Sequence, residues 1–292
     1  MSVPMALTYF LLRFTRRTTE TAETARSTAL GRQVPAEVSR GILRIADVEH
    51  TVVNGRPVTT LTPRKGATGT HLIYTHGGCY IYAMIPAYWT ILETLIRNSG
   101  VTVTVPHYGL APRHRVDEAY ELLTAVYTTV SASSDRVFLA GDSAGGGLAL
   151  GQALRYRETP PAGIILFSPL VDATLSNPAI PELASRDRQL GPAGLAAAAE
   201  WWAGERSVAD PLLSPLLGDL SALPPIWIYQ GGNDILAADA KLLAEKTGAH
   251  LVFEPKAFHD YVGAPWTPEA RRALAEVAEI LRARTGGDAA GG

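Results

Sequence analysis

A pentapeptide with one serine between two glycines, Gly-Asp-Ser-Ala-Gly, occupies residues 141–145. The apolar residues 137–140 before it predict a short buried strand, and the small and apolar residues 146–150 after it predict the start of a helix. A sharp turn between a strand and a helix lifts a serine hydroxyl out of the sheet, and the glycines avoid the collisions that a Cβ would cause there. Ser143 is therefore the expected nucleophile of an acyl-transfer reaction.

A serine hydroxyl becomes a strong nucleophile only when a base accepts its proton and a third group orients that base. In this type of arrangement the chain order is serine, acid, histidine. Two histidines follow Ser143: His250 stands in the apolar run 249–253, which predicts a strand, and His259 follows that strand. Catalytic side chains of open α/β sheets lie at the carboxyl ends of strands, which favours His259 as the base.

The acid is expected at the end of another strand. Residues 226–230 predict that strand, and Asp234 ends the loop that leaves it, before a predicted helix over 237–246. Asp234 is the favoured acid, and an N-cap of this helix is its structural alternative. Asp239 lies a turn into the helical pattern and is the weaker candidate.

Acyl transfer also requires N–H donors where negative charge develops on the carbonyl oxygen. The sequence His76-Gly77-Gly78 directly follows a predicted strand over 70–75, and its glycines let the backbone approach a bound group. With the N–H of Ala144, this loop would complete an oxyanion hole. A tight turn without a chemical role is the structural alternative.

Together these motifs resemble those of the hormone-sensitive-lipase-like esterases, a branch of the α/β-hydrolases. That family carries H-G-G-G and G-D-S-A-G-G segments, which stand here as His-Gly-Gly-Cys at 76–79 and Gly-Asp-Ser-Ala-Gly-Gly at 141–146. The segments Asp-Pro-Leu-Leu-Ser-Pro-Leu at 210–216 and Leu-Pro-Pro at 223–225 are also similar. The resemblance runs over about 70–262, most of the chain.

The resemblance implies a triad of Ser143, Asp234 and His259. The implied oxyanion and substrate-binding residues are His76, Gly77, Gly78, Cys79 and Ala144, of which the last three would donate N–H groups. Two segments depart from the family. Cys79 replaces the third loop glycine, either as a small packing residue or as a reactive thiol. Tyr-Gly-Leu-Ala-Pro-Arg at 108–113 replaces Y-R-L-A-P-E.

Predicted strands and helices alternate along the chain, which indicates a mostly parallel sheet covered by helices on both faces. The expected fold class is α/β, an α/β-hydrolase fold with a helical cap. The strands are expected at 70–75, 101–105, 137–140 and 163–167, and the helices around 88–98, 116–129 and up to 156. Asn54-Gly55 between β-branched residues predicts a hairpin at the start.

The alternation stops between residues 169 and 219, where five prolines and one predicted helix over 192–202 replace it. The family builds its lid at this place. We therefore expect a hydrolase core over 46–292 and a cap formed by 1–45 and about 170–218. Trp201 and Trp202 are expected either to wall the acyl pocket or to anchor the lid, and Tyr80 and Tyr82 leave the same choice open.

The N-terminal segment 5–14 is apolar, and its arginines follow the apolar stretch instead of preceding it as in a signal peptide. It predicts an amphipathic helix that packs on the substrate side of the core, and a membrane-surface helix is the alternative. No run of 18 apolar residues predicts a membrane span. A cytoplasmic location is expected.

The chain has 292 residues, a formal net charge of −2 and 47% hydrophobic residues. No basic surface for nucleic acid is expected, and the single cysteine excludes an intrachain disulfide. No His/Cys cluster has metal-ligand spacing, so neither a metal nor an organic cofactor is expected. The expected partner is a small-molecule ester, and a homodimer is compatible with the sequence.

These observations predict a serine carboxylesterase that hydrolyses short-to-medium-chain acyl esters through an acyl-enzyme. A lactone, carbamate or amide hydrolase, or a transacylase, would use the same triad. A non-catalytic small-molecule receptor is the alternative from another class. Receptors related to this family lack the catalytic histidine, whereas His259 stands in its place here.

Overall fold

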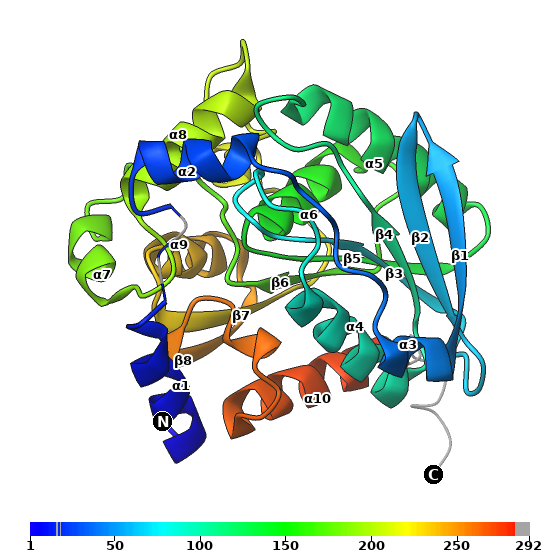
Figure 1. Cartoon of the computed structure of the whole chain (residues 1–292). Coiled ribbons are helices and arrows are strands. Elements are labelled where there is room, and N and C mark those ends of the chain that lie inside the picture. The colour runs from blue at the N-terminus through cyan, green and yellow to red at the C-terminus, as the bar shows by residue number, and fades with distance from the viewer. Residues whose placement is uncertain (16, 18, 284–292) are drawn as a thin grey trace.

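The computed structural model describes residues 1–15, 17 and 19–283. Eight strands form one sheet in the order β1-β2-β4-β3-β5-β6-β7-β8 (Figure 1). Their bounds are β1 (Ala46–Val53), β2 (Arg56–Pro63), β3 (Thr70–Thr75), β4 (Thr102–Pro106), β5 (Arg136–Asp142), β6 (Gly163–Phe167), β7 (Ile226–Asn233) and β8 (His250–Phe258). Only β2 runs antiparallel to its neighbours, so the predicted mostly parallel sheet is confirmed.

Helices cover both faces of this sheet, as the alternating pattern predicts. Their bounds are α1 (Val3–Leu12), α2 (Ala22–Leu30), α3 (Arg40–Ile45), α4 (Pro86–Ser99), α5 (Val116–Ser131), α6 (Ser143–Arg155), α7 (Ile180–Arg186), α8 (Pro192–Ala203), α9 (Ala237–Thr247) and α10 (Pro268–Arg282). One core joins the sheet to α5, α6, α8 and α9, and a second joins it to α4 and α10. None of the described helices is long and apolar enough to cross a membrane.

The first hairpin has the turn that its sequence predicts. Asn54 and Gly55 both have positive φ angles, 49° and 74°, between the antiparallel strands β1 and β2. This is the backbone of a type I′ turn, whose twist matches that of the strands. The parallel strands β3 and β6 are buried along their whole length, which fits the apolar stretches at 72–74 and 164–167 within them.

The segment between β6 and β7 contains α7, α8 and a short 3₁₀ helix at Pro215–Leu217, but no strand. The predicted helix over 192–202 is α8, and α7 had no recognisable pattern. Figure 1 shows α2 lying alongside α8. Thr19, shortly before α2, links the two helices, because it accepts hydrogen bonds from Gly191 N and Gly194 N at the start of α8. The other N-terminal helices pack elsewhere: α1 on α10 and β8, and α3 on α4.

The close contact between α6 and the end of β3 can be tested by substitution of Gly145. A Cβ added at Gly145 would lie 2.0 Å from the Thr75 carbonyl oxygen, a backbone atom that cannot move aside cheaply. We expect Gly145→Ala to lower the free energy of unfolding by about 3 kcal/mol. Thermal unfolding would measure this. Gly263→Ala is the control, since its Cβ would meet only Ala87 Cβ at 3.7 Å. Equal melting temperatures for both variants would contradict the packing argument.

Candidate active site

Ser143 lies at the junction of β5 and α6, where the backbone turns sharply from strand to helix. Its φ of 49° is in the left-handed region, which costs a residue with a side chain on the order of 1–2 kcal/mol. A hydrogen bond stabilises this turn, in which Thr75 Oγ1 donates to the Gly145 carbonyl at 2.7 Å. Ser143 lines a cavity of about 360 Å³. The strained turn therefore presents its hydroxyl to an open space.

Side chains from the ends of β7 and β8 complete a hydrogen-bonded chain with Ser143. Ser143 Oγ lies 3.1 Å from His259 Nε2, and His259 Nδ1 lies 2.8 Å from Asp234 Oδ2. Gln230 Nε2 donates to the same carboxylate oxygen at 2.7 Å, and Leu236 N donates to the other at 2.9 Å. These bonds hold the carboxylate in place and favour the tautomer with its proton on Nδ1. Nε2 is then free to accept the serine proton.

The alternative acid and base lie away from this chain. Asp239 accepts a hydrogen bond from Asn177 Nδ2 at 2.7 Å and does not contact His259. His250, the first residue of β8, pairs at the surface with Glu276 at 2.9 Å. The structure thus brings together Ser143, Asp234 and His259, the three residues that chain order and strand ends favoured.

The loop after β3 is anchored to the serine turn by Asp142. Asp142 Oδ1 accepts hydrogen bonds from Gly77 N at 2.9 Å and from the Tyr74 hydroxyl at 2.6 Å. The Tyr108 hydroxyl donates to the His76 carbonyl at 2.7 Å, and the two rings stack with centroids 4.6 Å apart. Burial lowers the pKa of His76 to about 4, so its ring is neutral at pH 7. His76 therefore holds the loop without adding charge.

The next two residues of this loop have the backbone that an anion site requires. Gly78 has a φ of 106°, and a Cβ there would lie 2.7 Å from Tyr82 Cβ. Its carbonyl accepts from Ile81 N and Tyr82 N, both at 2.9 Å. The N–H groups of Gly78 and Cys79 have no partner among the described residues. Both residues line the Ser143 cavity.

A second carboxylate, which the sequence patterns did not single out, also reaches the histidine. Asp260 Oδ2 lies 3.2 Å from His259 Nε2, the atom that faces Ser143. Asp260 has a φ of 53°, and its N–H donates to Ser168 Oγ at 3.0 Å. The only signal for it in the sequence is a carboxylate directly after the candidate base.

The carboxylates determine the charge state of His259. Burial opposes its charged form, but the negative charges of Asp234 and Asp260 outweigh burial, and the pKa of His259 lies well above 6.5. Burial and the charge of Asp260 raise the pKa of Asp142 well above its usual range. Other titratable groups face Asp260 from β3, the following loop and α4, namely Tyr74, Cys79 and Tyr88. Burial raises the pKa of each of the three, so all are neutral at pH 7.

Of the four aromatic residues considered for the pocket, only Tyr82 lines the Ser143 cavity. Tyr80 and Trp202 are buried in the core and stack on each other with centroids 4.9 Å apart. Trp201 is half-buried and packs against the same core. The segment 5–14, predicted to pack on the substrate side of the core, contributes Thr8 and Leu12 to the lining. The sequence patterns did not single out three other lining residues, Tyr88, Leu190 and Trp266.

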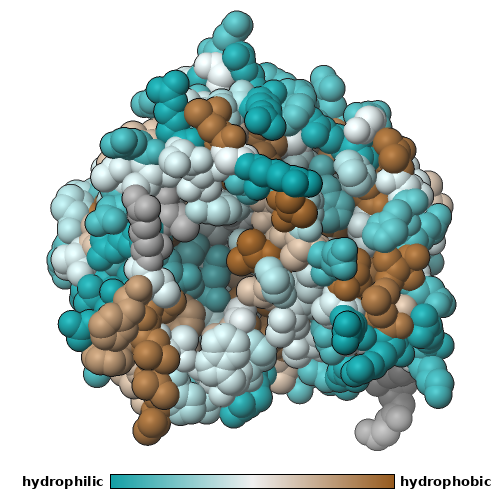
Figure 2. All heavy atoms as spheres, in the orientation of Figure 1, coloured by the Kyte–Doolittle hydropathy of each residue, from teal (hydrophilic) through white to brown (hydrophobic). Residues whose placement is uncertain are grey.

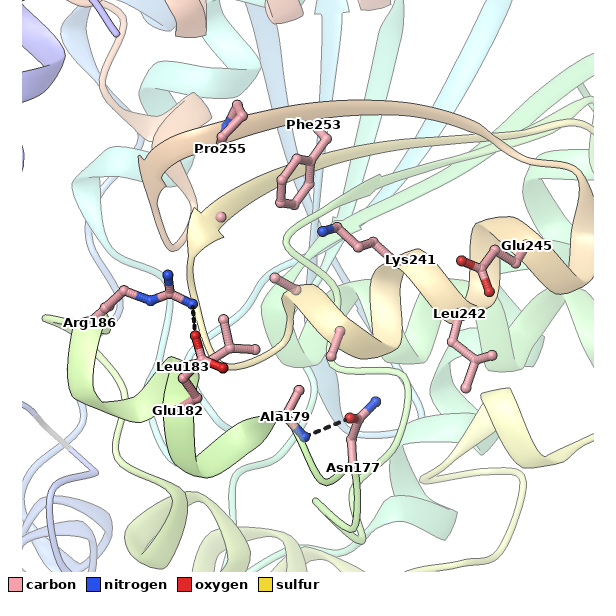
Figure 3. Close-up of a pocket in the computed structure, with 13 residues that line it drawn as sticks. Asn177, Ala179, Glu182, Leu183, Arg186, Lys241, Leu242, Glu245, Phe253 and Pro255 are labelled. Carbon is pink, nitrogen blue, oxygen red and sulfur yellow. Dashed lines mark hydrogen bonds and ion pairs between the residues drawn. The ribbon is translucent and has the colours of Figure 1, made fainter.

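Another cavity, of about 520 Å³, lies between α7, α9 and β8 (Figure 3). Its charged side chains are partly engaged with their neighbours: Arg186 pairs with Glu182 at 3.1 Å, and Lys241 Nζ lies 3.9 Å from the Phe253 ring centre. It contains neither Ser143 nor His259. Among the described residues there is no cluster of three metal-ligating side chains.

The burial of the Cys79 thiol can be tested by its reaction with a maleimide. Burial raises the pKa of this thiol to about 12, so at pH 8 only about one molecule in 10⁴ carries the reactive thiolate. We expect a maleimide to leave the folded protein unmodified and to label the unfolded protein promptly. Cys79 is the one cysteine of the chain, so intact mass reports its state directly. Rapid labelling of the folded protein would contradict the packing interpretation.

Comparison with known proteins assigns the family. A family model described as alpha/beta hydrolase fold matches residues 72–263. An acetyl-hydrolase from Streptomyces hygroscopicus is 34% identical over 230 residues, covering 75% of this chain and 77% of that protein. An esterase from Acinetobacter venetianus is 31% identical, covering 73% and 75%.

Solved structures support the same family assignment. The crystal structure of a hormone-sensitive lipase from a metagenome library aligns with a TM-score of 0.77 and 28% identity, covering 96% of this chain and 98% of that one. The predicted resemblance and fold class are therefore confirmed. The chain belongs to the α/β-hydrolase fold family, in its hormone-sensitive-lipase-like branch of carboxylic ester hydrolases.

Proposed function

We propose that the chain is a serine esterase that hydrolyses short-to-medium-chain acyl esters through an acyl-enzyme on Ser143. The observation that carries this proposal is the unbroken hydrogen-bonded chain from Ser143 Oγ through His259 to Asp234. It ends in a cavity that is also lined by Gly78 and Cys79, whose N–H groups have no partner among the described residues. A nucleophile, its base and donors for an oxyanion thus meet in one space.

In the first half of the reaction, His259 Nε2 takes the proton of Ser143 as Oγ attacks the ester carbonyl. Asp234 keeps the Nδ1 proton and stabilises the imidazolium that forms. The carbonyl oxygen becomes negative and is stabilised by the N–H groups of Gly78, Cys79 and Ala144. Ala144 N can serve because it lies in the first turn of α6, where N–H groups have no intrahelical partner.

In the second half, the tetrahedral intermediate collapses and the alcohol leaves with the proton of His259 Nε2. A water molecule then gives a proton to the same nitrogen and attacks the acyl carbon. Collapse of this second intermediate breaks the bond to Ser143 Oγ, which regains its proton, and the carboxylic acid is released. Each proton passes through Nε2, the atom that also contacts Asp260.

The size of the cavity supports the proposed acyl range. Its volume of about 360 Å³ is near the lower end of the roughly 300–1,000 Å³ usual for small-molecule sites. Its lining includes apolar side chains such as Leu12, Ile91 and Leu190, which suit a short aliphatic chain. Long acyl chains would extend beyond these walls into water.

We also propose that residues 1–45 and about 170–218 act together as a cap over the site. The packing of α2 on α8 supports this, as does the hydrogen bond from Tyr82 to Thr28 at 3.2 Å. In the second segment, Asp187 Oδ2 accepts from Ile235 N at 2.9 Å, directly after the triad acid. Movement of the cap would therefore displace the loop that carries Asp234.

The nucleophile is tested by substitution. We expect Ser143→Ala to lower kcat on p-nitrophenyl butyrate by at least about 10⁴-fold, because no other group can form the acyl-enzyme. Circular dichroism would verify that the variant is folded. Among acetate, butyrate, octanoate and palmitate esters, the wild-type kcat/KM is expected to be highest for the short chains. Full activity in Ser143→Ala, or a maximum at palmitate, would refute the corresponding part of the proposal.

The second carboxylate is tested by a pH profile. The base must be neutral to act, so kcat/KM is expected to rise as the pH increases through the elevated pKa of His259. Asp260→Asn keeps the shape and tolerates the left-handed φ, but removes the charge that stabilises imidazolium. The midpoint of the rise should move to lower pH by about one unit.

A surface histidine–carboxylate pair supplies the matched control for this profile. Glu276→Gln removes the partner of His250 far from the cavity and should leave the midpoint where it is. An unchanged midpoint in Asp260→Asn, with a lower kcat alone, would mean that Asp260 only supports the loop. The predicted electrostatic influence on His259 would then be wrong.

A further inference from the structure

The helix α1 exposes an apolar face although it is firmly attached to the protein. Its exposed large hydrophobic side chains are Val3, Leu7, Phe10 and Leu11, with Phe14 in the turn that follows; we call these five residues the α1 apolar face. Val3 and Phe14 are 81% and 71% exposed. Figure 2 shows strongly hydrophobic side chains at the lower left, where Figure 1 places α1.

The opposite side of α1 is held by specific contacts. Met5 is fully buried, and Ser2 donates through its N and Oγ to Glu269 at 2.6 and 2.7 Å. Trp266 Nε1 donates to Thr8 Oγ1 at 2.9 Å, and the Tyr9 hydroxyl donates to the Arg186 carbonyl at 2.6 Å. The helix is thus oriented by its polar contacts, and these leave the apolar face turned outward.

Basic residues stand in the chain beside this face, although the whole chain carries −2 and Glu269 is bonded to Ser2 at the start of the helix. The first acidic residue of the chain is Glu20, whereas arginines stand at 13, 16 and 17. The Arg13 guanidinium lies 5.1 and 5.3 Å from the ring centres of Phe10 and Phe14. Basic groups beside exposed aromatic and aliphatic side chains are the composition of helices that lie in the surface of an anionic membrane.

The α1 apolar face is continuous with the mouth of the active-site cavity. Thr8, Leu12 and Thr15, from the same helix and the turn after it, line that cavity. Trp266, which is 58% exposed, also lines it and is bonded to Thr8. One side of the helix therefore faces the Ser143 cavity, while another faces the surroundings.

We propose that the α1 apolar face docks on an anionic lipid surface, which places the Ser143 cavity beside esters dissolved in that surface. A ten-residue helix is about 15 Å long, which is enough to lie in a membrane surface and too short to span it. A second copy of the chain fits this face less well. In a two-fold interface the same patch meets itself, and Arg13, which lies over two of its aromatic rings, would then approach its own copy.

Binding can be tested apart from catalysis by using Ser143→Ala as the parent protein. We expect it to sediment with vesicles of phosphatidylglycerol and phosphatidylcholine, less with phosphatidylcholine alone, and less at high salt. Phe10→Ser with Phe14→Ser should weaken binding at least tenfold. Leu217→Ser with Val52→Ser is the control, because these side chains are 49% and 72% exposed, like the 50% and 71% of the two phenylalanines.

A second measurement links docking to the proposed esterase reaction, on which only this part of the inference rests. In the active protein, the Phe10 and Phe14 double variant should hydrolyse p-nitrophenyl butyrate in solution at the wild-type rate. It should lose activity on the same class of ester embedded in anionic vesicles. A wild type without any hydrolysis would refute the proposed function, whereas the vesicle-binding result would stand.

Three results would overturn the docking proposal. The first is a folded Ser143→Ala protein that does not bind anionic vesicles. The second is equal loss of binding in the control double variant. The third is a dimer in size-exclusion chromatography that Phe10→Ser with Phe14→Ser converts to monomer, because the face would then belong to a second copy of this chain.

Discussion

The close contact between the start of α6 and the end of β3 is the constraint on which the site depends. Gly145 lies against the Thr75 carbonyl so tightly that only a glycine fits, and Thr75 Oγ1 bridges the Ala140 and Gly145 carbonyls. This contact fixes the position of the serine turn relative to the loop that begins at His76. The nucleophile and the loop N–H groups are therefore positioned by one junction of buried backbone.

A second consequence of this junction is electrostatic. Asp142 ends β5 and accepts the Gly77 N–H, so a buried carboxyl sits between the serine turn and the loop. Burial and the neighbouring Asp260 raise its pKa, which favours the neutral carboxyl and so reduces the negative charge near the developing oxyanion. The carboxylates of Asp234 and Asp260 lie instead on the histidine side, where they raise the pKa of His259 and stabilise the imidazolium that each proton transfer creates.

Features that depend on local pattern could be predicted from the sequence, and features that depend on distant contacts could not. The alternating elements, the Asn54-Gly55 hairpin and the serine turn are local, and the structure contains all three. Chain order and strand ends were enough to select Asp234 and His259, which the structure places in contact.

The pocket was less predictable because its walls come together from far along the chain. Tyr9 and Arg186, whose hydrogen bond helps to place α1, are 177 positions apart. Periodicity could not reveal that Tyr80 and Trp202 stack in the core while Tyr82 lines the cavity. Nor could it reveal that Asp260 turns back to His259, because that depends on a left-handed backbone and a bond to Ser168.

The central claim is that the His259 and Asp234 pair activates Ser143 for attack on an acyl carbon. Labelling with an alkyl fluorophosphonate, which is attacked by activated serines, tests it most directly when the adduct is mapped by peptide mass spectrometry. The account predicts one adduct, on Ser143, which forms rapidly in the wild type and slowly in a folded His259→Gln variant. An adduct on another residue, or equally fast labelling without His259, would contradict it.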